Sequence, residues 1–260
     1  MQPSKKDLRI GEENYNHQNC LMKIIEYNKS IDIVVEFQDK YMAKVHTQYS
    51  SFKRGNVKNP YYPMVYNVGR IGNKYLSNMN GKQLKEYVAW QSMLKRCFDD
   101  EYKKKKPTYK NVTCCEEWLL YENFYNWLHN QENFDKWLNG SKWEIDKDIL
   151  VKRNKVYSPD TCCLVPNNVN GLFIGRSNVN KELPIGVVRS QNGLFRAKCS
   201  NQITGNEYTS YHSTVEEAFQ AYKTHKESLI KQVAELEYSK GNITKACYDA
   251  MMSYEVEIND

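Results

Sequence analysis

Residues 185–227 read IGVVRSQNGLFRAKCSNQITGNEYTSYHSTVEEAFQAYKTHKE. Three runs in this segment are rich in β-branched and aromatic residues, and turn signals around Gly193 and Thr204-Gly205 separate them; the runs are IGVVRS, LFRAKCS and NEYTSYH. Val, Ile, Tyr and Phe favour extended backbone, and Gly-containing pairs favour tight turns. The segment therefore predicts three short consecutive strands.

A long helix is predicted directly after the third strand. Ser213 is followed three residues later by Glu216, and Thr214 is followed by Glu217. Either hydroxyl therefore fits the N-cap position of a capping box, in which a side chain and a backbone N–H satisfy each other at the helix start. The apolar spacing that follows predicts a helix that extends to about Ser239.

This block of strands and helix resembles an AP2 DNA-binding domain. The residues that carry the resemblance lie on the first two strands and at the start of the helix: Gly186, Val187, Arg189, Gly193, Phe195, Ala197, Thr214, Glu216, Glu217, Ala218, Ala221 and Tyr222. The resemblance implies a sheet that lies in the major groove of double-stranded DNA. Arg189, Arg196 and Lys198 are then the DNA-binding residues. We expect them on one positive sheet face, because no acid occurs between Pro184 and Ser200.

A second resemblance lies in the middle of the chain. Asp146 and Asp148 flank Lys147 at the end of one predicted strand, and a second strand, CCLVP, leads into the helix start NNVN. This order resembles the ββα-metal core of phage HNH endonucleases. The resemblance implies Mg²⁺ bound by Asp146, Asp148 and either Asn168 or Asn170, with catalytic roles for Asp146, Lys147 and Asn170.

Lys147 stands where the nuclease family places its water-activating histidine. A lysine acts as a general base only when its surroundings favour the neutral amine, whereas two flanking aspartates favour the ammonium form. We therefore expect DNA cleavage to be impaired or absent. The aspartates also fit another interpretation, in which they close local turns and pair with Lys147, Lys152 or Arg153.

Residues 1–78 are predicted to form a small β-domain. The runs LMKIIEY, DIVVEF and YMAKV favour strands, and polar turn residues separate them. The second half of this domain interleaves Tyr and Phe with Lys and Arg, a composition that suits base stacking and phosphate contact. Lys53 and Arg54 are therefore candidate DNA-binding residues. The alternative is a tyrosine-rich barrel with solvated lysines.

The wider organisation follows from changes in these patterns. Residues 79–178 combine helical periodicity with the metal-core segment, residues 183–240 form the AP2-like domain, and residues 241–260 form an acidic tail. The run Lys103-Lys104-Lys105-Lys106 before Pro107 predicts an exposed charged loop. The predicted fold class is α+β: a small N-terminal β-domain, a helical and ββα-metal-like middle domain, and a C-terminal three-stranded sheet with one helix.

The composition bounds the class of protein. The 260 residues are 40% hydrophobic and 26% charged, which is ordinary for a chain that folds, and the net charge of +6 suits a polyanionic partner. Eight Cys without a CxxC pair indicate reduced thiols. No apolar run approaches membrane-spanning length, and the first residues lack a signal-type apolar core. We expect a protein of the bacterial cytoplasm that makes no membrane contact.

These observations favour a bacteriophage protein of HNH and AP2 type that binds double-stranded DNA and has impaired or absent nuclease activity. Two alternatives stay open. The first is an active, divalent-metal-dependent DNA endonuclease of the homing type. The second is a phage protein that binds and inhibits a host defence protein. Metal-dependent nicking would single out the first alternative, and the absence of salt-dependent duplex binding would favour the second.

Overall fold

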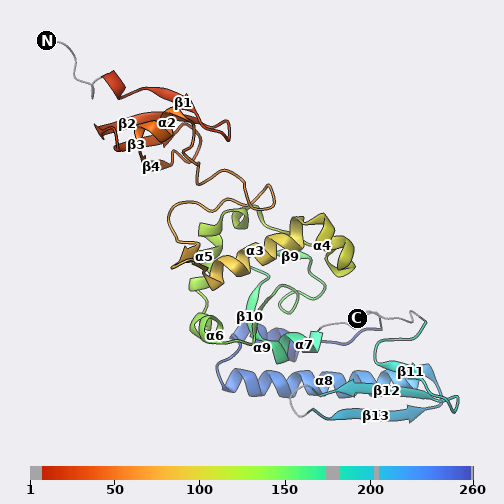
Figure 1. Cartoon of the computed structure of the whole chain (residues 1–260). Helices are drawn as coiled ribbons and strands as arrows, with labels where there is room; N and C mark the ends of the chain where they lie inside the picture. Colours follow the sequence, from red (N-terminus) through yellow and green to blue (C-terminus); the bar gives the residue numbers. More distant parts are fainter. Residues whose placement is uncertain (1–7, 174–181, 202–204, 259) are drawn as a thin grey trace. The chain divides into compact units, whose positions relative to one another are not determined.

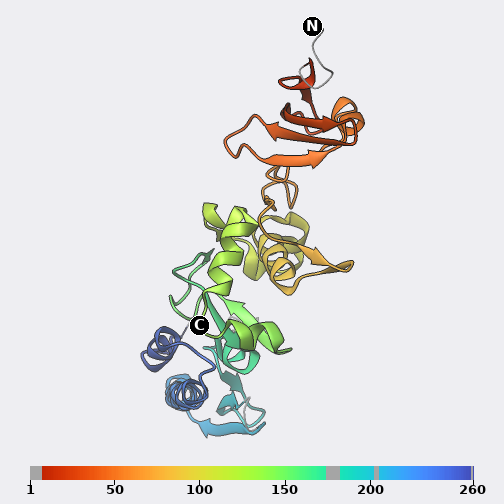
Figure 2. The ribbon, with the colours of Figure 1, turned by 90° about the vertical axis from the view of Figure 1, so that its left-hand side faces the viewer.

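The computed structural model describes residues 8–173, 182–201, 205–258 and 260. The chain is an α+β protein, as the sequence predicts, and it divides after Trp127 into two compact units (Figures 1 and 2). The first unit holds a four-stranded antiparallel sheet and a helical part, and the second holds a three-stranded sheet packed on a long helix. No helix within the described residues is both long enough and apolar enough to cross a bilayer.

An antiparallel sheet opens the first unit. Its four strands pair in chain order: β1 (Glu13–Tyr15), β2 (Leu21–Lys29), β3 (Asp32–Phe37) and β4 (Lys44–Thr47). Helix α2 (Tyr49–Lys53) follows, and its Phe52 is buried in one core with Ile24 and Ile33. The sheet confirms the predicted β-region. Strand β4 begins later than the run YMAKV predicts, because Met42 takes a positive φ of 47° in the preceding turn.

The rest of the first unit is built around two buried tryptophans. Its elements are β5 (Asn78–Met79), β6 (Lys82–Gln83), α3 (Lys85–Phe98), α4 (Asp100–Lys105), η1 (Pro107–Tyr109), β7 (Thr113–Cys114), η2 (Glu116–Leu119) and the start of α5 (Tyr121–His129). Trp90 and Trp118 are almost fully buried, and the indole N–H of Trp90 donates to the carbonyl oxygen of Trp118 at 2.7 Å. This bond satisfies the polar end of a large apolar side chain in the core.

The lysine run at residues 103–106 is the last turn and C-cap of α4 rather than a loop. Asp99 caps the helix by accepting from the backbone N–H of Tyr102. Cations in a last helical turn interact favourably with the partial negative charge of the helix end. The prediction of a loop is wrong because a run of like charges is compatible with a helix when the charges lie at its C-terminal end.

The second unit begins with a small helix, a hairpin and another helix. Its elements are α6 (Phe134–Asn139), β8 (Trp143–Asp146), β9 (Val156–Tyr157), β10 (Cys163–Pro166) and α7 (Asn167–Phe173). Strands β8 and β10 pair antiparallel, with Asp146 opposite Cys163. Because α7 starts directly after β10 and contacts both strands, the three elements follow the strand, strand, helix order that the sequence predicts.

Three strands and two helices complete this unit. They are β11 (Val187–Arg189), β12 (Phe195–Ser200), β13 (Glu207–His212), α8 (Val215–Ser239) and α9 (Lys245–Met252). The strands form an antiparallel sheet with β12 in the centre, and α8 lies along one face of it (Figure 1). Thr214, not Ser213, is the N-cap of α8, in a capping box with Glu217. Helix α9 packs against α8.

The hairpin and the C-terminal sheet share one apolar core. Ile149, Val165 and Val169 from the hairpin and α7 belong to the same buried cluster as Ala197 of β12 and Ile230 of α8. The predicted domain boundary at residues 178–183 lies mostly outside the described residues. The core on both sides of it is continuous.

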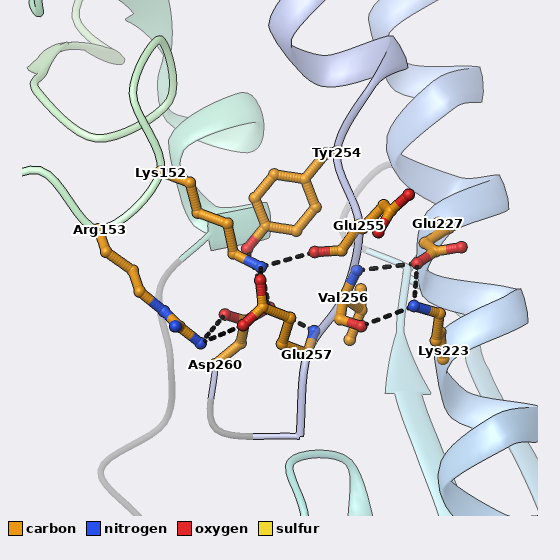
Figure 3. Close-up of polar contacts among 9 residues, drawn as sticks. All are labelled: Lys152, Arg153, Lys223, Glu227, Tyr254, Glu255, Val256, Glu257 and Asp260. Atoms are coloured by element: carbon orange, nitrogen blue, oxygen red, sulfur yellow. Dashed lines mark hydrogen bonds and ion pairs between the residues drawn. The ribbon is translucent and has the colours of Figure 1, made fainter.

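The segment predicted as an acidic tail contributes four side chains to this core, those of Ile243, Cys247, Met251 and Val256. Cys247 and Met251 of α9 are completely buried, and Val256 is 3% exposed. The backbone of Val256 is held by α8, because Glu227 accepts its N–H at 2.8 Å and Lys223 donates to its carbonyl oxygen at 2.9 Å (Figure 3).

Ion pairs tie the same segment to the connection between β8 and β9. The ammonium group of Lys152 lies 2.9 Å from a carboxylate oxygen of Asp260 and donates to the carbonyl oxygen of Glu255 at 2.6 Å (Figure 3). Arg153 pairs with Glu257 at 2.7 Å. Lys152 and Arg153 therefore pair with acids in the segment that follows α9, and they do not pair with Asp146 or Asp148.

Candidate nucleic-acid interface

The central strand β12 separates polar from apolar side chains. Ala197 and Cys199 are buried toward α8, and Arg196 and Lys198 alternate with them. Successive side chains of a strand point to opposite faces of a sheet. Arg196 and Lys198 therefore lie on the face opposite α8, which we call the outer face.

Cross-strand pairing assembles the outer face. Arg196 lies opposite Val188 of β11 and Tyr211 of β13, and Lys198 lies opposite Thr209. Directly opposed residues in an antiparallel pair share a face. Val188 and Tyr211 are 38% and 53% exposed, so they border the cations as accessible apolar and aromatic surface.

Arg189 does not share this face. It pairs with Phe195, which packs against the core, and its guanidinium carbon lies 5.0 Å from the centre of the Phe195 ring. The expectation that Arg189, Arg196 and Lys198 form one positive face is therefore corrected. The first of them lies on the α8 side of the sheet, because β11 and β12 pair with Val188 opposite Arg196.

Arg196 retains hydrogen-bonding capacity. Its Nε is buried, and no acceptor within the described residues bonds to it. Buried donors in folded proteins almost always have a partner, so an orphaned donor of this kind calls for an ordered water or ion. The residue stands in the middle of the central strand.

Lys198 forms a partly exposed ion pair. Its ammonium group pairs with Glu207 at 2.7 Å, and the two side chains are 31% and 39% exposed. The hydrogen bond from Lys198 lowers the pKa of Glu207. A solvated pair of this kind contributes little to stability, so a phosphate can replace the carboxylate at low cost.

Gly186 and Tyr222, two residues of the AP2-like motif, lie close together on the face of the sheet that packs on α8. Gly186 precedes β11 with a φ of +76°, and a Cβ at this position would overlap the ring of Tyr222 on α8. Further along, Tyr208 stacks on His225 with ring centres 4.0 Å apart. These contacts seat the sheet on α8 and keep the outer face in a single orientation.

The predicted catalytic segment forms a closed polar turn. One carboxylate oxygen of Asp146 accepts the backbone N–H groups of Asp148 and Ile149, both at 2.8 Å. Lys147 is 8% exposed and donates to Asp148 at 2.9 Å, and its carbonyl oxygen accepts from Asn154 at 2.6 Å. The arrangement matches the interpretation in which the aspartates close local turns and one of them pairs with Lys147.

The electrostatics of this turn disfavour a charged Asp146. Burial, and next the neighbouring charge of Asp148, raise the pKa of Asp146 to about 6. The ammonium group of Lys147 is bonded to Asp148 instead. Lys147 therefore stabilises the charge of Asp148, whereas Asp146 is buried beside the Asp148 carboxyl group.

Three of the magnesium ligands that the nuclease resemblance implies, Asp146, Asp148 and Asn168, form hydrogen bonds within the protein. The amide of Asn168 donates to Glu237, and Asn170 lies half-buried on α7. The ammonium group of Lys147 donates to one carboxylate oxygen of Asp148. Within the described parts of the chain, no three His, Cys, Asp or Glu side chains converge on a point. Mg²⁺ binding stays a prediction from sequence.

The two candidate residues of the first unit lie at the end of α2. Lys53 is 53% exposed and pairs with Glu12 at 2.9 Å. Tyr49 donates to the same carboxylate, and the guanidinium of Arg9 lies over the Tyr49 ring at 4.2 Å. Arg54 is the exposed C-cap residue. Lys53 and Arg9 belong to a small network around Glu12.

Comparison with protein-family models, with curated proteins and with solved structures found no match. The structure itself supplies a three-stranded antiparallel sheet packed against a long helix. This architecture is compatible with an AP2 domain.

Two residues of the outer face are absent from the sequence-based candidates. Tyr211 and Thr209 border Arg196 and Lys198 only through the register of β12 and β13. Their two-residue spacing in NEYTSYH, which places both on one face of a strand, is the sequence signal that points to them.

Proposed function

We propose that this chain binds double-stranded DNA through the outer face of the β11–β13 sheet. Arg196 and Lys198 contact phosphates or base edges in the major groove, and Tyr211 and Thr209 border them. A three-stranded sheet is a known reader of DNA grooves, and Arg and Lys supply the charge that neutralises phosphates.

The observation that carries the proposal is that Arg196 and Lys198 lie on the same outer face of the central strand. Two cations on one sheet face, one of them in a solvated ion pair with Glu207, suit acceptors on a nucleic acid. The net charge of +6 supports the same class of ligand.

DNA cleavage receives less support. The buried turn at Asp146 has its hydrogen bonds closed internally, and Lys147 is held as an ion-paired cation by Asp148. An active endonuclease and an inhibitor of a host protein remain predictions that the following experiments separate from DNA binding.

The test of DNA binding uses two variants that differ in the face they alter. Arg196→Ala with Lys198→Ala removes both cations of the outer face, and Arg189→Ala removes one cation of the same sheet on the α8 side. We expect the double variant to bind a duplex at least tenfold more weakly at moderate salt, on the order of 1–3 kcal/mol. We expect Arg189→Ala to lose much less.

Circular dichroism of both variants checks that the fold is retained. Equal binding by the wild type and the double variant across the salt range would contradict the proposal. A wild type that lacks salt-dependent duplex binding altogether would favour a protein partner. Incubation of supercoiled plasmid with Mg²⁺, Mn²⁺ or EDTA, with Asp146→Ala as control, then decides whether bound DNA is also nicked.

A further inference from the structure

Positive charge gathers at one place in the first unit. Residues 95–110 contain seven cations and three acids, in a chain whose whole net charge is +6. The cations lie at the end of α3, at the end of α4 and around η1: Lys95, Arg96, Lys103, Lys104, Lys105, Lys106 and Lys110. We call residues 95–110 the α4 surface.

Two tyrosine rings of the α4 surface each contact one of its cations. The ammonium group of Lys95 lies 5.2 Å from the centre of the Tyr102 ring, and the guanidinium carbon of Arg96 lies 5.8 Å from that of Tyr109. The two rings are 5.7 Å apart. Cation–π contacts restrict long side chains that would otherwise be free, so these two cations lie side by side.

Two of the three acids of this segment have partners within it. Asp99 accepts from a backbone N–H as the N-cap of α4, and Glu101 pairs with Lys104 at 2.7 Å. Lys103 donates to the carbonyl oxygen of Val112 at 3.2 Å. Beyond these, the segment presents three further exposed ammonium groups, those of Lys105, Lys106 and Lys110.

We propose that the α4 surface is a second nucleic-acid contact, which binds the phosphate backbone of a duplex independently of base sequence. The inference rests on the proposed function of the outer face. Lysines on flexible stems suit phosphates as point charges. A protein partner would need an apolar anchor at the centre of the patch, whereas both aromatic rings here lie under the patch's own cations.

The test compares two variants of the full chain that lose the same charge. The first carries Lys105→Gln, Lys106→Gln and Lys110→Gln. The matched control carries Lys29→Gln, Lys82→Gln and Lys231→Gln, three lysines that are equally exposed elsewhere in the chain. The affinity for a random-sequence duplex is measured from about 50 to 200 mM salt, a range in which phosphate contacts change affinity strongly.

We expect the α4 variant to flatten the plot of log affinity against log salt by about 2 to 3, since each lost phosphate contact removes about 0.9. The control should change this slope by less than about 1. Equal slopes for the two variants, with binding still lost in Arg196→Ala with Lys198→Ala, would overturn the α4 contact alone. Absence of duplex binding in the wild type would overturn both proposals.

Discussion

Replacing Asp146 by Asn should stabilise the protein at neutral pH. Burial and the charge of Asp148 raise the pKa of Asp146 from 3.8 to about 6. The side-chain oxygen of Asn can still accept the two backbone N–H groups that close the turn. Its NH₂ group can donate to Asp148, as the protonated acid does. The variant therefore mimics the neutral form that the fold prefers.

The magnitude follows from the pKa difference between the folded and unfolded states. A shift of about two units, at 1.36 kcal/mol per unit, sets a ceiling of roughly 3 kcal/mol on the gain. The folded state holds this proton more tightly, so the contribution of Asp146 to the free energy of unfolding falls as the pH rises from about 4 to 6. The advantage of Asp146→Asn should be near zero at pH 4 and reach its plateau above pH 6.

Urea unfolding at several pH values, in EDTA, measures this difference. Asp160→Asn, at an exposed aspartate between β9 and β10, is the matched control and should show no such pH dependence. A variant that is less stable than the wild type at pH 7.5 would refute the reasoning. A repeat in Mg²⁺ adds a check, because a metal bound by Asp146 would stabilise the wild type and not the variant.

Three further substitutions test the packing of the second unit by urea unfolding. Gly186→Ala should destabilise by about 2 kcal/mol or more, because the added Cβ meets the Tyr222 ring at a positive φ; unchanged stability would contradict the described contact. Thr214→Ala should cost about 1 kcal/mol through loss of the capping box of α8, and Thr214→Ser should restore most of it. Lys152→Met should cost about 1 kcal/mol by removing the nearer of the two cations, Lys152 and Arg153, that pair with Asp260. Burial raises the pKa of Asp260, but hydrogen bonds from the Glu257 backbone and from Lys152 outweigh it, and the net pKa is lowered. This contribution should be complete above the ordinary aspartate pKa of about 3.9 and be lost as the pH falls through the lowered folded value.

Several parts of the candidate site are predictable from local sequence. The period-two alternation of LFRAKCS places Ala197 and Cys199 on one face and the two cations on the other. The capping-box spacings of Ser213 and Thr214 mark the start of α8 to within one residue. Both signals arise between residues that are close along the chain, where the geometry of one strand or one helical turn dictates which side chains meet.

The placement of Arg189 is not predictable in this way. Three cations without an acid indicate a positive face only if their strands pair in the right register. A shift by one residue moves a side chain to the other side of a sheet. Here Val188 opposes Arg196, and just before this strand Gly186 lies close to the ring of Tyr222 on α8, far along the chain.

Local patterns were thus sufficient for the α+β class, for the three C-terminal strands and for the long helix, because these depend on periodicity, turn residues and capping. Packing between distant segments decided the rest. It buried residues 245–256 against α8 in place of a loose acidic tail, closed the turn at Asp146, and joined the hairpin and the sheet in one core. Burial, register and the pKa of a carboxyl group are set by neighbours far away in the chain, and a linear pattern does not specify which neighbours these are.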